Sequence, residues 1–263
     1  MLKDQEYLEI FLRPIEVAKR YRPKLGLGSQ AGISAQEFET LYEADPFYHW
    51  LGLDAPEIYA AHRLAGGITS LYRQIGIGCE RLICRILQDA LFLDSSNLKW
   101  GYEITEGEKK RFVHLDAGVR FALICDSAIR TRLQEWSEAQ MRRSGTQIAP
   151  IGIVFEIRQG YKSKDSKRQN ADIQSASRAY QNGYLPCMLV LSQQIDADVK
   201  SRYQNAGWVM LIGNLALDEY QSTYTFFRKV IGYDLREFFN RNREYIRQRI
   251  LEVVHSLWQP ETD

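Results

Sequence analysis

Two charged residues interrupt a segment that otherwise predicts a buried β-strand. Glu156 and Arg158 lie in the apolar run IGIVFEIR, residues 151–158, which is short, β-branched and more typical of a strand than of a helix. Side chains alternate along a strand, so Glu156 and Arg158 point to the same face. A charge in a core strand is costly unless it is paired, hydrogen-bonded or bound to a metal. The pair is therefore either a structural ion pair closing a sheet edge or part of a site that does chemistry.

Two further carboxylates lie in segments with regular apolar patterns. Asp116 falls within KRFVHLDAGVRFALI, residues 110–124, which alternates like a strand. Aspartate is disfavoured in strand interiors, so we expect Asp116 to be a turn residue or a functional one. Glu80 lies beside the apolar stripe of a predicted helix, and its i+4 neighbour is Cys84 rather than a cation. We therefore keep Glu80 as a candidate inward-facing carboxylate.

A dense run of positive charge follows the strand at 151–158. Five cations stand against one acid, Asp165, between residues 158 and 168: Arg158, Lys162, Lys164, Lys167 and Arg168. Such a run directly after a buried glutamate predicts contacts to phosphate, and a solvated charge run at the start of a helix is the alternative. The amides of Gln169, Asn170 and Gln174 are suited either to reading base edges or to capping that helix.

The elements that we expect to position these residues are helices and strands that alternate along the chain. We predict helices at 1–24, 56–93, 127–144, 166–181, 195–204 and 226–257, and strands at 98–104, 110–124, 151–158, 185–192 and 207–213. Strands that are apolar on both faces and separated by helices favour parallel pairing. In the helix at 166–181 we expect Ala171, Ile173, Ala176 and Ala179 to face inward. We assign the aromatic residues of 40–53 to packing, and the glycines of the 56–93 helix to a break or to close contacts between helices.

This order of elements, with an aspartate on the second strand and an acidic-x-basic pattern on the third, resembles the PD-(D/E)xK nuclease fold. More narrowly it resembles type II restriction endonucleases, and FEIRQGYKSKDSKRQNADI is similar to endonucleases of the ApaLI kind. The resemblance covers about residues 80–213. It implies an α/β core of helix, three-stranded meander, helix, strand, helix and strand, with added N- and C-terminal helices. We expect a helical region at 1–75 packed on the core, a nuclease core at 76–214 and a helical extension at 215–263, forming one compact domain.

The resemblance also assigns roles to residues. In that family the aspartate and the glutamate bind Mg²⁺, which implies Asp116 and Glu156 here, and a lysine two residues on helps to position or activate the attacking water. Arg158 holds that lysine position. Arginine can hold a phosphate bidentately, but it cannot be deprotonated to serve as a base. Either Arg158 acts electrostatically, or Lys162 or Lys164 reaches in from the following loop.

The expected function is that of a Mg²⁺-dependent type II restriction endonuclease, which hydrolyses double-stranded DNA at a short, palindromic sequence as a homodimer. The expected DNA contacts are Lys164, Lys167, Arg168, Gln169 and Asn170. One alternative is a repair or structure-specific nuclease of the same fold. Another is a catalytically inactive DNA-binding protein in which Arg158 marks a lost site. A metal-free hydrolase based on His62 or His114 is disfavoured, because no Ser or Cys motif accompanies either histidine.

Composition narrows the class of protein without choosing among these functions. The net charge of +1 over 263 residues neither requires nor excludes a polyanionic partner. No segment approaches the ~20 consecutive apolar residues of a membrane span. Asp4, Glu6 and Glu9 stand where a secretion signal would be apolar, so we expect a cytoplasmic protein. The four cysteines have no CxxC spacing, which predicts reduced, buried thiols rather than a zinc site.

Overall fold

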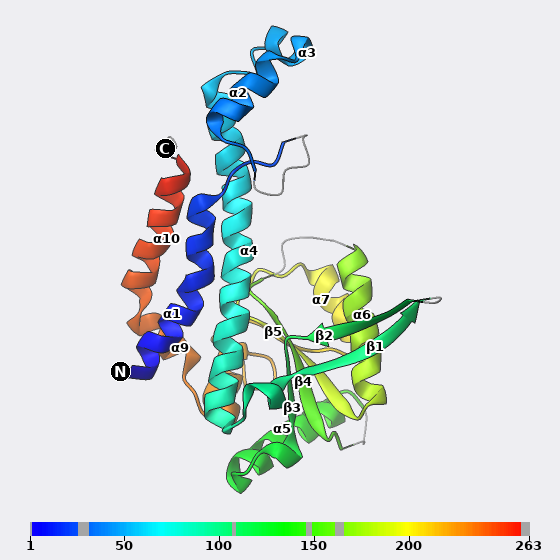
Figure 1. Cartoon of the computed structure of the whole chain (residues 1–263). Helices are drawn as coiled ribbons and strands as arrows, with labels where there is room; N and C mark the ends of the chain where they lie inside the picture. Colours follow the sequence, from blue (N-terminus) through cyan, green and yellow to red (C-terminus); the bar gives the residue numbers. More distant parts are fainter. Residues whose placement is uncertain (1, 26–31, 107–108, 146–148, 161–165, 259–263) are drawn as a thin grey trace. The chain divides into compact units, whose positions relative to one another are not determined.

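The chain forms two compact units. The computed structural model describes residues 2–25, 32–106, 109–145, 149–160 and 166–258, except for the side chains of 2, 105, 106, 109 and 166–169. One unit comprises residues 1–78 and 241–263, and the other comprises residues 79–240. The helix α4 (Pro56–Leu91) crosses the boundary between the two units at residues 78 and 79 (Figure 1). Residues 215–240, expected to belong to a C-terminal extension, fall in the same unit as the predicted core.

The first unit is helical throughout its described residues. Its elements are α1 (Leu2–Glu16), the 3₁₀ helix η1 (Val17–Arg20), α2 (Ala35–Glu43), α3 (Pro46–Trp50), the first part of α4 and α10 (Arg243–Trp258). Ion pairs join α1 and η1 to α10: Arg249 Nη2 lies 2.7 Å from Glu16 Oε1, and Lys19 Nζ lies 3.4 Å from Glu252 Oε2. No helix in the described part of the chain is both long and apolar enough to cross a membrane.

The second unit contains two sheets. A two-stranded antiparallel sheet pairs β1 (Trp100–Glu106) with β2 (Lys109–Leu115). A four-stranded sheet has the order β3-β4-β5-β6, with β3 (Ala117–Arg120), β4 (Gly152–Arg158), β5 (Tyr184–Val190) and β6 (Val209–Leu211). The strand β3 is antiparallel to β4, whereas β4, β5 and β6 are mutually parallel. The predicted parallel pairing and the general prediction of a mixed α/β fold are thus confirmed.

Helices connect and flank the strands of this unit. They are the rest of α4, the 3₁₀ helices η2 (Ser95–Leu98) and η3 (Phe121–Leu123), α5 (Ser127–Arg143), α6 (Ser166–Gln181), α7 (Ala197–Asn205), α8 (Thr223–Phe226), the π-helix η4 (Phe227–Ile231) and α9 (Leu235–Arg241). Asp126 and Asp196 begin α5 and α7, and the Oδ1 atom of each accepts hydrogen bonds from two backbone N–H groups of its helix. The helices α6 and α7 are the crossovers between parallel strands.

The three segments expected to form the meander do pair as neighbours, β1 with β2 and β3 with β4, both antiparallel, but they do not form one continuous sheet. The segment 110–124, predicted as one strand, is divided by a bend at Asp116 into β2 and β3, which belong to different sheets. The strand β3 pairs with β4, although α5 separates the two in the chain. The physical reason for the division is local, because aspartate fits poorly in a strand interior and a bend lets the chain leave one sheet for the other.

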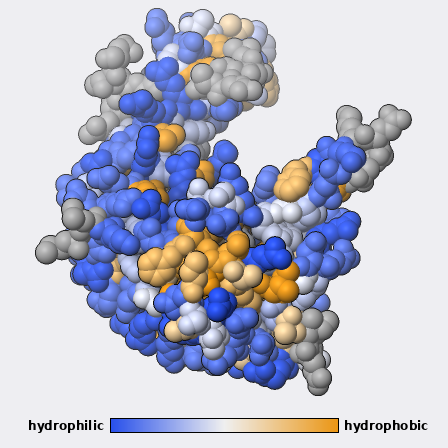
Figure 2. All heavy atoms as spheres, turned by 60° about the horizontal axis from the view of Figure 1, so that its bottom comes forward, coloured by the Kyte–Doolittle hydropathy of each residue, from blue (hydrophilic) through white to orange (hydrophobic). Residues whose placement is uncertain are grey.

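Large apolar side chains remain exposed in both units. Phe47 and Trp50 are 61% and 80% exposed, so their assignment to packing was wrong. Phe92, Leu123 and Ile151 of the second unit are exposed as well. Figure 2 shows apolar residues gathered on one face and surrounded by polar ones. Exposed apolar areas of this kind mark contact surfaces.

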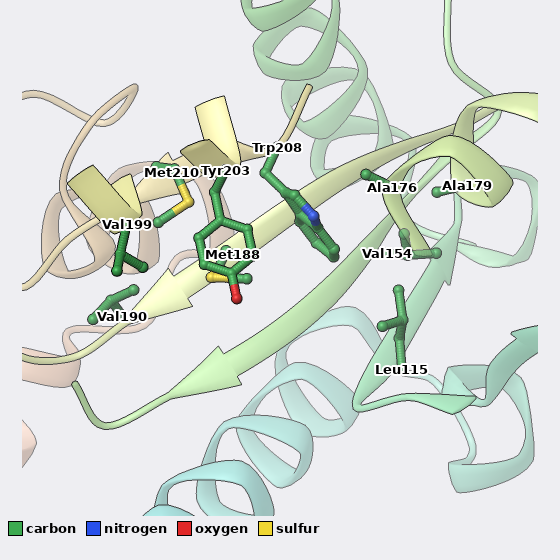
Figure 3. Packing of buried hydrophobic residues seen from close by; sticks show 10 residues of the cluster. All are labelled: Leu115, Val154, Ala176, Ala179, Met188, Val190, Val199, Tyr203, Trp208 and Met210. Atoms are coloured by element: carbon green, nitrogen blue, oxygen red, sulfur yellow. The ribbon is translucent and has the colours of Figure 1, made fainter. Parts of the chain in front are cut away.

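The sheet is fixed to α6 and α7 by one apolar cluster (Figure 3). Strand residues Val154, Met188 and Val190 meet small residues of α6 and larger residues of α7. The other members of the cluster are Leu115, Ala176, Ala179, Val199, Tyr203, Trp208 and Met210. Residues 154, 156 and 158 share one face of β4 because of the strand period. Glu156 and Arg158 therefore project to the α6 side of the sheet.

The glycines of α4 provide a matched test of its packing. A Cβ atom at Gly78 would collide with the backbone carbonyl of Phe11, whereas a Cβ at Gly76 would meet nothing within 4 Å. We expect Gly76→Ala to raise the free energy of unfolding by roughly 0.5–1 kcal/mol, because alanine is the better helix former. We expect Gly78→Ala to lower it by about 1–3 kcal/mol through overpacking. Urea unfolding of both variants checks the pair, and equal effects would contradict the packing of α4.

Candidate functional site

The register between β3 and β4 brings Asp116 and Glu156 together. Ala117 pairs with Phe155, so the next antiparallel position places Asp116 opposite Glu156. The chain bends there, and Asp116 Oδ2 accepts a hydrogen bond of 2.7 Å from the backbone N–H of Ile157. The Asp116 carboxylate thus accepts the hydrogen bond that the N–H of Ile157 would otherwise donate to a backbone carbonyl of a longer β3. This contact fixes Asp116 beside the charged end of β4.

Arg158 lies among three carboxylates. Its Nη2 pairs with Glu156 Oε1 and lies 3.7 Å from Asp172 Oδ1, and its Nη1 lies 3.8 Å from Asp116 Oδ2. The side chains of these four residues are only 7–17% exposed. The pairing of Glu156 with Arg158 agrees with the sequence prediction. The pair lies on an inner strand of the sheet, but beyond Phe155, where the pairing of β4 with β3 stops and only β5 continues beside it.

Asp172 is the member of this cluster that sequence reasoning missed. Ala171 was expected to face inward from α6, but it is exposed and Asp172 is buried instead. Tyr203 Oη donates a 2.6 Å hydrogen bond to Asp172 Oδ2, and Trp208 Nε1 donates one of 3.0 Å to the carbonyl oxygen of Asp172. The sequence did contain a signal for the burial of Asp172, because residue 172 shares the i, i+4, i+7 face of the helix with residues 176 and 179.

The helix α4 contributes Glu80 and Cys84 to the same cluster. Burial raises the pKa of Glu80, the charge of Asp116 raises it further, and Arg158 and Arg81 oppose the rise. Cys84 Sγ donates a 3.4 Å hydrogen bond to the carbonyl oxygen of Asp116. Burial, with smaller contributions from Asp116 and Glu80, raises the pKa of Cys84 to about 12. Cys84 is therefore a neutral thiol, and Glu80 lies within the electric field of the other carboxylates.

Most of the predicted DNA contacts cannot be placed. Lys162 and Lys164 lie outside the described residues, as do the side chains of Lys167, Arg168 and Gln169. Asn170 is described and exposed, and its Oδ1 accepts a 2.7 Å hydrogen bond from Arg202 Nη2. This contact links α6 to α7. The roles of these residues in DNA binding stay predictions.

Two of the carboxylates around Arg158 have the chemistry that Mg²⁺ prefers. Within the described residues, no group of three or more His, Cys, Asp or Glu side chains is arranged to hold a metal ion. Mg²⁺, however, is commonly held by only one or two carboxylates, with water and substrate phosphate completing its shell. Asp116 and Glu156 supply two carboxylates of the right chemical kind. They also lie at the carboxyl end of β4, where open α/β sheets bind ligands.

No protein-family model, curated protein or solved structure matches this chain. Since a fold alone does not define an activity, function has to be inferred from the geometry and chemistry of the site. That site comprises Glu80, Asp116, Glu156, Arg158 and Asp172.

The raised pKa of Glu80 predicts a pH-dependent contribution to stability. A carboxyl whose pKa is higher in the folded than in the unfolded chain stabilises the fold while protonated, and this contribution is lost as pH rises through the folded pKa. We therefore expect Glu80→Gln to raise the melting temperature of the metal-free protein at pH 7. The gain should shrink as pH falls through the raised folded pKa and be smallest below the ordinary glutamate value of 4.5, where glutamate is protonated in both states.

Thermal unfolding between pH 4 and pH 8 measures this effect. Glu135→Gln, which changes an exposed carboxylate on α5, is the matched control and should show no such trend. A Glu80→Gln variant that is less stable than the wild type at pH 7 would contradict the electrostatic picture of the site.

Proposed function

We propose that this protein is a Mg²⁺-dependent endonuclease that hydrolyses phosphodiester bonds of double-stranded DNA at a short, palindromic sequence, as type II restriction endonucleases do. The observation that carries the proposal is the convergence of Asp116 and Glu156 at the end of β4, with Arg158 between them. Hard oxygen ligands beside a buried guanidinium suit a substrate whose reacting group is a phosphate.

Each residue of the site has a chemical role in this proposal. Asp116 and Glu156 would hold Mg²⁺, which lowers the pKa of a bound water and neutralises charge developing on the phosphoryl group. Arg158 binds phosphate oxygens with its planar guanidinium but cannot accept a proton. Glu80, whose pKa is raised by burial and by Asp116, is a carboxylate suited to accept one, because a raised pKa makes a carboxylate a stronger base.

We also propose that the protein acts as a homodimer. A two-fold symmetric enzyme matches a palindromic site and can cut both strands. The second unit exposes large apolar side chains, among them Phe92, Leu123 and Ile151, and exposed apolar surface is of the kind that dimers bury. We propose that the protein acts in the cytoplasm, where such an enzyme would meet its DNA substrate.

A second function is favoured by one observation. Arg158 stands where the family's lysine would be, and it contacts the two carboxylates that would hold the metal. In a DNA-binding protein without catalytic activity, such ion pairs would be the permanent state of the site. That protein would bind DNA in the presence of Mg²⁺ without turnover.

Digestion of long, unmethylated duplex DNA separates these functions. We expect discrete fragments with Mg²⁺ and none with EDTA, and the sequenced fragment ends should share a short terminal sequence. Fragment ends without a common sequence would favour a repair or structure-specific nuclease instead. Intact DNA that is retained in a gel-shift assay would favour the inactive binding protein.

Isosteric changes at the carboxylates test their assignment. We expect Asp116→Asn and Glu156→Gln each to reduce cleavage by more than about 100-fold, because loss of a ligand should exceed the typical effect of losing an outer-shell partner. Binding to DNA in EDTA should be retained. Glu135→Gln is the control and should cleave normally. Full activity in either carboxylate variant would refute the site.

A further inference from the structure

Arg158 and a divalent ion compete for the same carboxylates. We propose that Arg158 is an internal counter-ion that occupies the metal site of the metal-free protein, and that Asp172 retains its guanidinium when a metal takes Asp116 and Glu156. Asp172 is thus a positioning residue. This inference rests on the proposed function, because the metal site belongs to it.

The need for a counter-ion follows from burial. Asp116, Glu156 and Asp172 all lie within 4 Å of the guanidinium, and each side chain is at most 17% exposed. Like charges held this close repel one another and are poorly solvated. The guanidinium of Arg158 compensates them in the absence of metal. A divalent ion on Asp116 and Glu156 would provide that compensation instead, and would repel the guanidinium.

Asp172 is built to hold a guanidinium in place. Its Oδ2 accepts the Tyr203 hydroxyl at 2.6 Å, and its Oδ1 faces Arg158 Nη2 at 3.7 Å. Tyr203 and Trp208, which donates to the Asp172 carbonyl, are 1% and 3% exposed and belong to the cluster of Figure 3. The position of Asp172 is therefore set by the packed core between α6, α7 and the sheet.

The geometry of arginine permits the change of partner. The guanidinium reaches Asp116 through Nη1, whereas Glu156 and Asp172 share Nη2. The contacts to Asp116 and Asp172 are of nearly equal length, 3.8 and 3.7 Å, and Nη1 also donates a 3.2 Å hydrogen bond to the carbonyl oxygen of Ile157. A metal on Asp116 and Glu156 would replace two of the carboxylate contacts and leave the one to Asp172, and the planar guanidinium would then have donors to offer a substrate phosphate.

A double-mutant cycle on Mn²⁺ binding tests this inference without DNA. Mn²⁺ stands in for Mg²⁺, since both prefer oxygen ligands, and binding to the full chain is measured by isothermal titration calorimetry. We expect Arg158→Met to tighten Mn²⁺ binding about tenfold, and Asp172→Asn to weaken it on the order of tenfold, as outer-shell changes do. In the Arg158→Met background, Asp172→Asn should change the affinity less than about twofold, because no guanidinium remains to be held.

Two results would overturn the proposal. An equal effect of Asp172→Asn in both backgrounds would show that Asp172 acts through its charge alone or as a ligand. Mn²⁺ binding that is absent, unchanged or weaker in Arg158→Met would show that Arg158 does not compete with the metal. Should Arg158→Met fail to fold, Arg158→Lys replaces it, because a single amine on a shorter stem cannot contact all three carboxylates. It too should bind Mn²⁺ more tightly than the wild type.

Two further variants separate positioning from general stability. Tyr203→Phe keeps the ring in the core but removes the hydroxyl that holds Asp172, so it should weaken Mn²⁺ binding only when Arg158 is present. Glu135→Gln should change nothing. The failure of this inference is distinct from that of the proposed function: a protein that cleaves DNA but shows no coupling between Asp172 and Arg158 refutes only the inference. A protein that shows the coupling but cleaves no DNA refutes only the endonuclease.

Discussion

Compensation of buried charge is the constraint on which this site depends. Carboxylates inside a protein are unfavourable unless each finds a hydrogen bond, a cation or a proton. The structure meets this demand differently for each residue: Asp116 accepts a backbone N–H, Glu156 pairs with Arg158, Asp172 accepts a core hydroxyl, and the raised pKa of Glu80 favours its protonated form. One arginine is shared among three of them, so a change at any one alters the others.

Local rules of sheet and helix bring these residues together. The strand β3 begins only at Ala117, after the bend at Asp116, which leaves the N–H of Ile157 to the side chain of Asp116. The crossover from β4 to β5 lays α6 on the sheet through Ala176 and Ala179, and the same helical face carries Asp172 to the end of β4. The apolar packing that stabilises the fold therefore also sets the positions of the charged groups.

The local part of this arrangement could be predicted from the sequence. The helices α5 and α6 begin and end close to where periodicity places them, and the shared face of Glu156 and Arg158 follows from the strand period. The helix predicted at 226–257 is instead divided into η4, α9 and α10. The bend at Asp116 follows from the poor fit of aspartate in a strand, but the pairing of β3 with β4 rather than with β1 or β2 could not be predicted, because strand pairing is a nonlocal choice. Asp172 was missed for another reason: the inward face of α6 was assigned to apolar residues only, although residue 172 shares that face with Ala176 and Ala179.

The cation at the end of β4 is an arginine, Arg158, and not a lysine, and if the site is a nuclease site as proposed, this changes which residue can exchange the proton. A lysine can hold a phosphate and can also exchange a proton, whereas an arginine keeps its charge at every relevant pH. If the site hydrolyses phosphodiesters as proposed, the proton has to be taken by another group. Glu80 lies in the field of Asp116, and its pKa is raised in the direction that a base requires. The two roles of one lysine would then be shared between Arg158, which binds, and Glu80, which accepts the proton.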